Sequence, residues 1–295
     1  MKLEPQRKLQ SAMEYLMTYG WAILAIAIVM VSLYSLGIFS LGNLKPTATP
    51  GSCQVIRTAA QVSLAGQCNN LIPRYVGQFN GHSSSIYIPS STSLGYSNDK
   101  VTYVMWFEAT ANALTIQGNQ YPMSQIVSCT PCIAFYFAGN GELRYSIETT
   151  TGDFVSFYSS QLLPNVWYQA VMTYDGTTLT GYLNGKLQGT ATTSSGTIVN
   201  TNPLYFGSYV GIINNGNFNG SIADAQIYNA SLDNTTITML YHEGIGGAPV
   251  GLQNLVGWWP LNGNANDYSG GNNQGTPTNV IWNANWQSGY TAPSS

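Results

Sequence analysis

The stretch WYQAVMTYDGTTLTGYLNGKLQGT, residues 167–190, decides the fold. Two runs within it, 167–174 and 179–183, are rich in the aromatic and β-branched residues that favour strands. Asn184 and Gly185 follow, a pair that readily adopts the positive φ angles of a two-residue hairpin turn before a third strand. The stretch therefore predicts an antiparallel sheet of short strands joined by tight turns.

Further strand-like runs extend on both sides of this stretch, separated by turn residues. They lie at residues 84–89, 101–110, 133–138, 143–149, 154–159, 204–209 and 222–228. Residues 53–79 form a mixed segment with a candidate hairpin, and residues 235–243 predict one short helix that ends at Gly244. Many short strands with Gly- and Asn-rich turns predict a mainly β protein, an antiparallel β-sandwich or a barrel.

The composition agrees with a β protein and excludes one class of partner. Of the 295 residues only 7% are charged, against about 25% in ordinary globular domains. Gly, Asn, Thr, Ser and Tyr replace the missing charged residues, with 31 Gly and 20 Tyr in the chain. The chain has 9 Lys and Arg against 12 Asp and Glu. It lacks the basic surface that phosphate contacts require, so we expect no nucleic-acid partner. The length fits one large β domain with an appendage, or two small domains.

The N-terminal segment has a different pattern. Three of the nine basic residues precede residues 15–44, which carry no charge, and about 20 apolar residues suffice to cross a bilayer as a helix. The basic flank predicts a cytoplasmic N-terminus, with the residues after about Gly42 outside the cell. A secretory signal peptide would end at a small-residue cleavage site, and no A-x-A site follows Phe39. A single-pass anchor is the simpler interpretation.

The start of this apolar run supports a more specific hypothesis. Residues 10–24, QSAMEYLMTYGWAIL, with their basic flank, resemble the archaeal class III signal peptide of type IV pilin-like proteins. The resemblance implies that a membrane peptidase cuts after Leu9, frees Gln10 and leaves the helix on the mature chain. Glu14 would then pair with the terminal amine of a neighbouring pilin-like subunit, because an unpaired carboxylate on an apolar helix is costly. Leu9 departs from the small residue usual there, and Glu14 alternatively lies at the membrane interface.

These features divide the chain into four parts. Residues 1–9 form a cytoplasmic leader, residues 10–44 a hydrophobic helix, residues 45–52 a stiff linker rich in Pro and Thr, and residues 53–295 a head. A helix of residues 15–44 would be about 45 Å long, longer than a bilayer core of about 30 Å, which favours a filament. The predicted location is the cell membrane with an extracellular domain, or an extracellular filament.

Four blocks of the head resemble laminin G-like domains of the concanavalin A-like jelly-roll class. They lie at residues 78–94, 167–190, 218–232 and 255–275. The resemblance implies two antiparallel sheets packed face to face, and a role in adhesion or in recognition of a carbohydrate or surface protein. The last block opens the domain in many family members but lies near the end of this chain. Residues 255–295 are either a permuted strand of this sandwich or a partial repeat, and they are too few for a separate core.

Laminin G-like jelly rolls often hold calcium, and the resemblance implies candidate ligands here. Asp267 is the first choice, with Asn264 and Asn266 in the same run and Asp224 at the family's acidic position after Gly-Ser-Ile. Carboxylate and amide oxygens are the ligands that calcium prefers. The alternative is that these residues form Asx turns.

The four cysteines all lie in the part predicted to be outside the cell, where disulfides persist. A Cys53–Cys68 bond would close a small loop, and a Cys129–Cys132 bond would staple the SCTPC turn. This is one of the three pairings that four cysteines allow. A Cys-x-x-Cys between strands does not fit a thioredoxin-like redox site, and the spacing of the cysteines and histidines does not fit zinc.

Three Asn-x-Ser/Thr sequons predict sites of N-glycosylation. They begin at Asn219, Asn229 and Asn234. Two of the three flank the strand-like run 222–228, so at least one of them is expected to be exposed. The alternative is that sequons arise by chance in a chain so rich in Asn, Ser and Thr.

The head does not carry the usual signature of a glycosidase. That chemistry needs two carboxylates about 5–9 Å apart, and after the apolar run no consecutive pair of acidic residues is two or four apart along a strand. Its tryptophans at 106, 167, 258 and 259 lie on strand runs and are expected in the core. We therefore expect no catalytic residues and a pilin-like surface protein with a binding head. The alternatives are a lectin-like membrane-anchored protein that never polymerises and, last, a glycan hydrolase.

Overall fold

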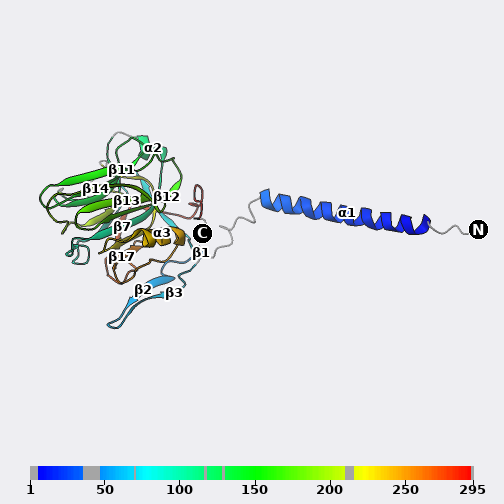
Figure 1. Cartoon of the computed structure of the whole chain (residues 1–295), viewed down its shortest axis with the longest axis horizontal. Helices are drawn as coiled ribbons and strands as arrows, with labels where there is room; N and C mark the ends of the chain where they lie inside the picture. Colours follow the sequence, from blue (N-terminus) through cyan, green and yellow to red (C-terminus); the bar gives the residue numbers. More distant parts are fainter. Residues whose placement is uncertain are drawn as a thin grey trace, which may run out of the picture. The chain divides into compact units, whose positions relative to one another are not determined.

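The computed structural model describes residues 6–35, 47–69, 71–115, 118–127, 130–209 and 216–293, and within the first range the side chains of 17 and 19–32. The chain divides into two compact units, Met1–Lys45 and Pro46–Ser295, each with its own architecture. Figure 1 labels the helices and strands of both units.

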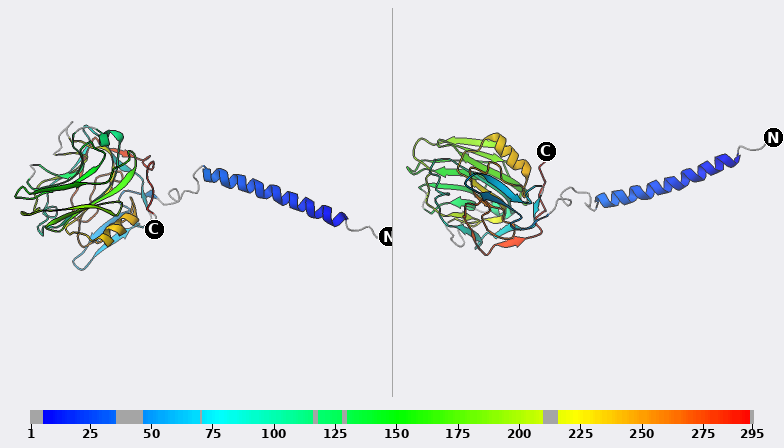
Figure 2. Two further views of the ribbon diagram at one scale, coloured as in Figure 1. Left: turned by 45° about the horizontal axis from the view of Figure 1, so that its top comes forward. Right: turned by 90° about the horizontal axis from the view of Figure 1, so that it is seen from below.

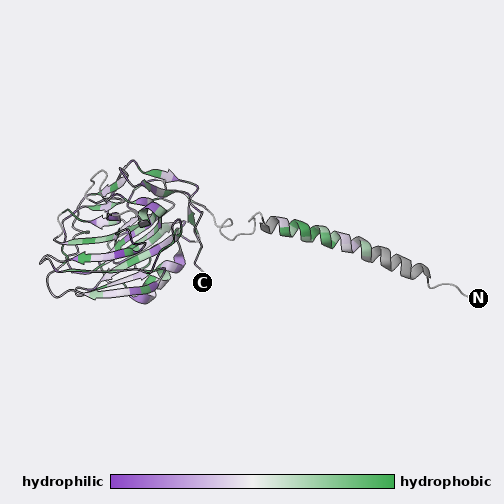
Figure 3. Ribbon diagram, turned by 90° about the horizontal axis from the view of Figure 1, so that it is seen from above, coloured by the Kyte–Doolittle hydropathy of each residue, from purple (hydrophilic) through white to green (hydrophobic). Residues whose placement is uncertain are grey.

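Helix α1, Gln6–Ser35, forms the described part of the first unit. Ten large apolar side chains between Met17 and Val31 are each more than half exposed, and Figure 3 shows this stretch as largely hydrophobic. Within the residues that the structure describes, no helix is long and apolar enough to cross a membrane.

The predicted processing and assembly residues lie on the backbone of α1. Leu9, Gln10 and Glu14 all belong to the helix, but their side chains are outside the described residues, as is the predicted continuation of the helix over residues 36–44. The class III signal and the pairing of Glu14 therefore stay predictions.

One sheet of the second unit has seven strands, and all its neighbouring pairs are antiparallel. In spatial order the strands are β11 (Phe154–Tyr158), β10 (Leu143–Glu148), β9 (Cys132–Phe137), β8 (Gln120–Gln125), β15 (Leu204–Phe206), β6 (Ser85–Ile88) and β18 (Thr276–Thr278). The predicted run 204–209 is strand only over its first three residues.

The other sheet has eight strands, and Figure 2 shows both sheets from two further sides. In spatial order the strands are β14 (Lys186–Thr192), β13 (Thr178–Leu183), β12 (Trp167–Tyr174), β7 (Val101–Ala109), β16 (Asn219–Tyr228), β5 (Val76–Asn80) and β19 (Ile281–Asn283), with β17 (Leu255–Trp259) also paired to β16. Asn184 and Gly185, with φ of 50° and 72°, form the predicted turn between β13 and β14.

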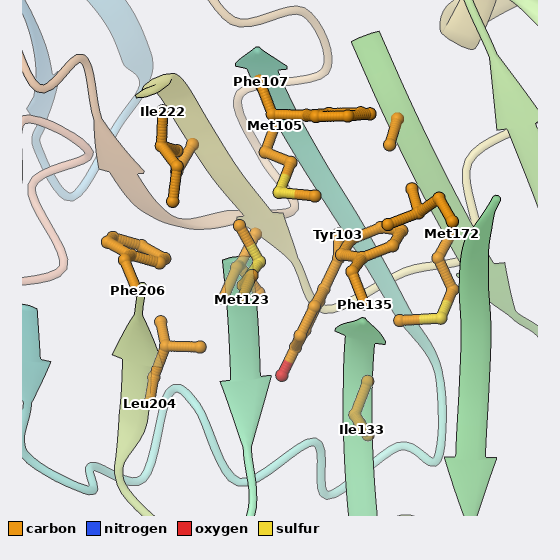
Figure 4. Packing of buried hydrophobic residues seen from close by; sticks show 14 of the residues in the cluster. Tyr103, Met105, Phe107, Met123, Ile133, Phe135, Met172, Leu204, Phe206 and Ile222 are labelled. Carbon is orange, nitrogen blue, oxygen red and sulfur yellow. The ribbon is translucent and has the colours of Figure 1, made fainter. Parts of the chain in front are cut away.

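The main core lies between the two sheets, because alternate side chains of each strand point into the same interior. Tyr103, Met105 and Phe107 of β7 enter it from the eight-stranded sheet, and Met123 and Phe206 enter it from the seven-stranded sheet. Figure 4 shows these side chains packed against one another. Burying each such side chain contributes about 1.5–3 kcal/mol to stability, and the predicted antiparallel β-sandwich is confirmed.

The outer face of the eight-stranded sheet is covered by a helix. Helix α3, Asn234–Glu243, begins after Asp233, whose carboxylate accepts a hydrogen bond from the Thr236 backbone N–H. It ends at Gly244, which has a φ of 80°. Ile237 and Leu240 of α3 pack on outward-facing side chains of the sheet. The helix predicted for residues 235–243 is confirmed.

A hairpin covers another part of the same outer face. It consists of β2 (Cys53–Arg57) and β3 (Val62–Gly66). Val55 of β2 belongs to the same hydrophobic cluster as Ile237 and Leu240 of α3. The predicted Cys53–Cys68 disulfide is confirmed, with 5.0 Å between the Cα atoms. Three short elements complete the unit: β1 (Thr47–Ala48) pairs in parallel with β4 (Ile72–Pro73), and α2 spans Ala111–Thr115.

The C-terminal segment contributes strands to both sheets of the sandwich. β17 pairs with β16 and β19 pairs with β5 in the eight-stranded sheet, while β18 pairs with β6 in the seven-stranded sheet. Trp259 of β17 is fully buried in the main core. The segment that begins at residue 255 is thus part of this sandwich.

Candidate functional site

The outer face of the seven-stranded sheet carries a row of aromatic side chains around one arginine. Ile133, Phe135 and Phe137 point into the core, so Tyr136 between them points outward. The strand register sets Tyr136 opposite Arg144, and Arg144 opposite Tyr158. The side chains that form what we name the aromatic face are Tyr87, Tyr121, Tyr136, Arg144, Phe154, Tyr158, Tyr205 and Tyr209.

The guanidinium of Arg144 is held by three aromatic rings. Its Cζ lies 5.2 Å from the ring centroid of Tyr158, 5.3 Å from that of Tyr136 and 5.4 Å from that of Phe154. Each distance is within the range of a cation–π interaction. The Oγ of Ser156 accepts hydrogen bonds from Nε at 2.9 Å and from Nη2 at 2.6 Å. These contacts fix the plane of the guanidinium.

Tyrosine pairs extend the aromatic face across the sheet. Tyr121 lies 5.2 Å from Tyr136 and 5.2 Å from Tyr209, between ring centroids. Near the other edge, Tyr87 of β6 and Tyr205 of β15 are cross-strand partners with ring centroids 5.4 Å apart. The middle of the face is thus packed while its two sides stay open to solvent.

Exposure and protonation decide what this face offers a ligand. Phe154 is 43% exposed, Tyr158 39% and Tyr87 40%, whereas Tyr136 is only 7% exposed. Burial raises the pKa of Tyr136 to about 12, although the positive charge of Arg144 opposes this shift. The phenol therefore stays protonated at neutral pH. The face presents flat apolar rings, hydroxyl groups and a cation, which suits binding rather than bond cleavage.

The predicted calcium ligand Asp224 lies on the opposite side of the sandwich, in a bulge of β16. It is 3% exposed, and its carboxylate accepts hydrogen bonds from Trp258 Nε1 at 2.8 Å and from Gln226 Nε2 at 2.9 Å. Burial raises the pKa of Asp224 to about 7, although the hydrogen bonds from Trp258 and Gln226 favour the ionised carboxylate and lower the pKa. The carboxylate also borders a cavity of about 40 Å³.

The carboxylate of Asp267, the first choice for calcium, organises the turn after β17. Oδ1 accepts the backbone N–H groups of Trp258 and Ser269, at 3.0 and 2.8 Å, and Oδ2 accepts that of Asn273 at 2.8 Å. Asn264 bonds the Tyr268 hydroxyl and the backbone N–H of Asn266.

N–H donors thus bond to both carboxylate oxygens of Asp267 and of Asp224. Over the described ranges, no group of three or more His, Cys, Asp or Glu side chains is placed to hold a metal ion. The arrangement of Asp224 and Asp267 fits hydrogen bonding rather than a preformed calcium cage. Calcium binding stays a prediction.

The remaining predicted residues are spread over the head. Cys129 is outside the described residues; Cys132 lies buried on β9, with its Sγ 3.9 Å from a carboxylate oxygen of Glu148. The Cys129–Cys132 bond therefore stays a prediction. Of the sequon asparagines, Asn234 is exposed at the first turn of α3, whereas Asn219 and Asn229 at the two ends of β16 are half-buried.

The sequence correctly placed the tryptophans but did not identify the aromatic face. Trp106, Trp167, Trp258 and Trp259 are all less than 5% exposed, as predicted for core residues. Arg144 had no assigned role. The available signal was the strand alternation in residues 132–158, which sets polar and aromatic side chains on one face of three consecutive strands.

Comparison with known proteins supports the fold. A family model for the concanavalin A-like lectin/glucanases superfamily, of laminin G type, matches residues 80–238. No curated protein matches the chain. Among solved structures, a Bacteroides ovatus protein described as a candidate carbohydrate-binding protein has a TM-score of 0.53 and 14% identity; the match covers 77% of this chain and 64% of that one.

A second solved structure is similar over a shorter part. The receptor-binding domain of botulinum neurotoxin mosaic serotype C/D has a TM-score of 0.50 and 15% identity, and the match covers 66% of this chain and 51% of that one. The chain thus spans less than two thirds of the length of either structure. The family model covers more than half of the chain. This chain therefore belongs to the concanavalin A-like lectin/glucanases superfamily.

Proposed function

We propose that the head binds a saccharide on the aromatic face, as a non-enzymatic recognition domain. The observation that carries the proposal is the exposure of Phe154 and Tyr158 beside Arg144, on the sheet face that no described helix or hairpin covers. Exposed aromatic patches rimmed by polar groups are typical of binding sites. The fold likeness to the Bacteroides ovatus protein, described as a candidate carbohydrate-binding protein, supports this assignment.

We also propose that the N-terminal helix displays this head at the cell surface, as a pilin-like subunit. Apart from Ser32, the described side chains of α1 are apolar or aromatic on every side of the helix, and they are exposed. A helix of this kind is stable where neighbouring helices or lipid surround it. The Cys53–Cys68 disulfide is consistent with a head outside the cell.

The binding proposal is tested by calorimetric titration of the full chain. The probes are oligogalacturonate, a hyaluronan oligosaccharide, sialyllactose, lactose and methyl-esterified oligogalacturonate. Removing the rings of Phe154 or Tyr158 by substitution with Ala should weaken binding about 3- to 10-fold per ring.

The matched control is Leu187→Ala, because Leu187 is 59% exposed on the other sheet and should leave the affinity unchanged. Failure of every probe to bind would overturn the proposal. Cleavage of a bound probe would favour the hydrolase alternative instead.

The display proposal is tested at the mature N-terminus and at Glu14. Mass spectrometry should find a chain that begins at Gln10, and Glu14→Ala should prevent incorporation into filaments without preventing membrane insertion. Glu4→Ala lies in the predicted leader and is the control that should assemble normally. An intact Met1 would contradict processing, and a mutant found unchanged in filaments would contradict the pairing of Glu14. Wild-type protein found only in membranes would favour the lone anchor.

A further inference from the structure

Arg144 is a half-buried cation without an anionic partner in the described part of the chain. Its guanidinium donates to Ser156 through Nε and Nη2 and lies over three rings. No ion pair and no hydrogen bond of its Nη1 group joins it to another described residue. By contrast, the guanidinium of Arg57 donates to three backbone carbonyls. Arg144 therefore keeps free donors on an exposed face.

The position of Arg144 makes these donors selective for an anion. A partly desolvated cation is costly to leave unpaired, and its attraction to an anion is stronger there than in bulk water. The rings and Ser156 fix the planar fork in advance, so little side-chain entropy remains to be lost on binding. A carboxylate matches this fork with two parallel hydrogen bonds.

The surrounding groups limit the ligand to one with isolated acidic groups. Phe154 and Tyr158 are the exposed rings beside the guanidinium, and each offers a flat apolar surface to a sugar ring. Glu148 lies on the same face, opposite Phe154 and four residues along the strand from Arg144, a separation of about 13 Å. Its negative charge opposes a densely charged polyanion, as does the net charge of −3 on the chain.

We propose that the aromatic face binds a saccharide that carries a carboxylate, such as a uronic or sialic acid unit, and that Arg144 pairs with this carboxylate. The inference rests on the proposed saccharide binding and deepens it. Phe154 and Tyr158 stack on the sugar, while Arg144 distinguishes an acidic unit from a neutral one.

The test compares acidic and neutral probes on the full chain by calorimetric titration. At least one of oligogalacturonate, the hyaluronan oligosaccharide and sialyllactose should bind, and its neutral counterpart should bind about 10- to 100-fold more weakly. The counterparts are the methyl ester for oligogalacturonate and lactose for sialyllactose. Arg144→Gln should lower the affinity for the acidic probe by the same factor and leave the affinity for the neutral probe unchanged.

Two further variants separate the pairing from structural effects. Arg144→Lys keeps the charge but loses the fork, and its affinity for the acidic probe should be intermediate. Arg74→Gln is the matched control, because the exposed Arg74 also lies over a tyrosine ring, that of Tyr75 at 5.3 Å, outside the aromatic face. This control should bind like the wild type. If Arg144→Gln does not fold, Arg144→Lys and the paired acidic and neutral probes still show whether Arg144 pairs with the carboxylate of the saccharide.

The outcomes distinguish this inference from the proposed function. Equal affinity for acidic and neutral probes, or acidic binding unchanged in Arg144→Gln, would overturn the role of Arg144 while saccharide binding stands. A sulfated oligosaccharide is titrated beside this panel, and its binding in preference to every carboxylated probe would overturn the choice of carboxylate. No binding of any saccharide would overturn both proposals.

Discussion

The two outer faces of the sandwich differ in what covers them. On the eight-stranded sheet, α3 and the β2–β3 hairpin bury Val104, Val171 and Tyr228 completely. On the seven-stranded sheet, Phe154, Tyr158 and Tyr87 remain about 40% exposed. Both faces are rich in aromatic residues, so aromatic content alone does not separate core from binding surface. The covering elements decide the role of each face.

The largest expected difference between the two faces is in stability. Trp106 on the covered face is 1% exposed and stacks on Tyr241 of α3, with ring centroids 5.8 Å apart. Trp106→Ala should lower the free energy of unfolding by about 3–5 kcal/mol, because it leaves a cavity. Tyr158→Ala on the open face should cost only about 1 kcal/mol, for the lost cation–π contact. Urea unfolding of both variants measures the two losses in the free energy of unfolding. Equal losses would contradict the distinction between a covered face and an open face.

A second expectation concerns pH on the covered side. Asp224 has a pKa raised to about 7 in the folded chain, against an ordinary value of 3.8. The folded state therefore holds the proton more tightly than the unfolded state, so this stabilisation is present below about pH 4 and is lost as the pH rises through 7. The loss amounts to up to about 4 kcal/mol.

Asp224→Asn isolates this effect. Asn is neutral at every pH and tolerates the φ of 47° that Asp224 adopts. Between pH 4 and pH 8 the wild type should lose more stability in urea unfolding than the variant does. Exposed acids such as Asp153 and Asp233, whose pKa values are lowered by hydrogen bonds, are shared by both proteins and cancel in the comparison. Parallel pH profiles would show that Asp224 is ionised in the fold.

The covering hairpin should depend on its disulfide. The Cys53–Cys68 bond closes a segment with a sequence separation of 15, which corresponds to about 3 kcal/mol in the chain-entropy account. A Cys53→Ser, Cys68→Ser double variant should lose about this much in thermal or urea unfolding. It should keep its affinity for saccharides, since the hairpin lies on the other face. Weakened saccharide binding would indicate that the two faces are coupled.

A smaller effect is expected at Asp267, and it separates two roles for that residue. Asp267→Ala should lose about 1–3 kcal/mol, because three backbone N–H groups lose their acceptor. The loss should be the same in calcium and in chelator if the carboxylate only organises the turn. Calcium that raises the melting temperature of the wild type but not of the variant would instead support the calcium prediction.

The fold was largely predictable because its signals are local. Strand alternation, the Asn184–Gly185 turn and Gly244 at the end of α3 each act within a few residues. The Cys53–Cys68 pair was also predictable, since it closes a short loop in a β-hairpin.

The candidate site was less predictable because it depends on strand register and on covering elements. Tyr87 meets Tyr205 from 118 positions away, and nothing local in either strand predicts that they are partners. The run around Asp267 illustrates a different limit. Calcium ligands and Asx turns use the same residue types, and only the positions of the N–H groups show how the oxygens are used.

The most direct test of the account is to map where a bound saccharide protects the backbone. Hydrogen–deuterium exchange of the full chain should be measured with and without the tightest-binding probe of the panel. We expect slower exchange in β10 and β11, which carry Arg144, Phe154 and Tyr158, because β11 is the edge strand of its sheet. We expect no change in α3 or in the β2–β3 hairpin. Protection of α3 or the hairpin, with β10 and β11 unchanged, would contradict the account.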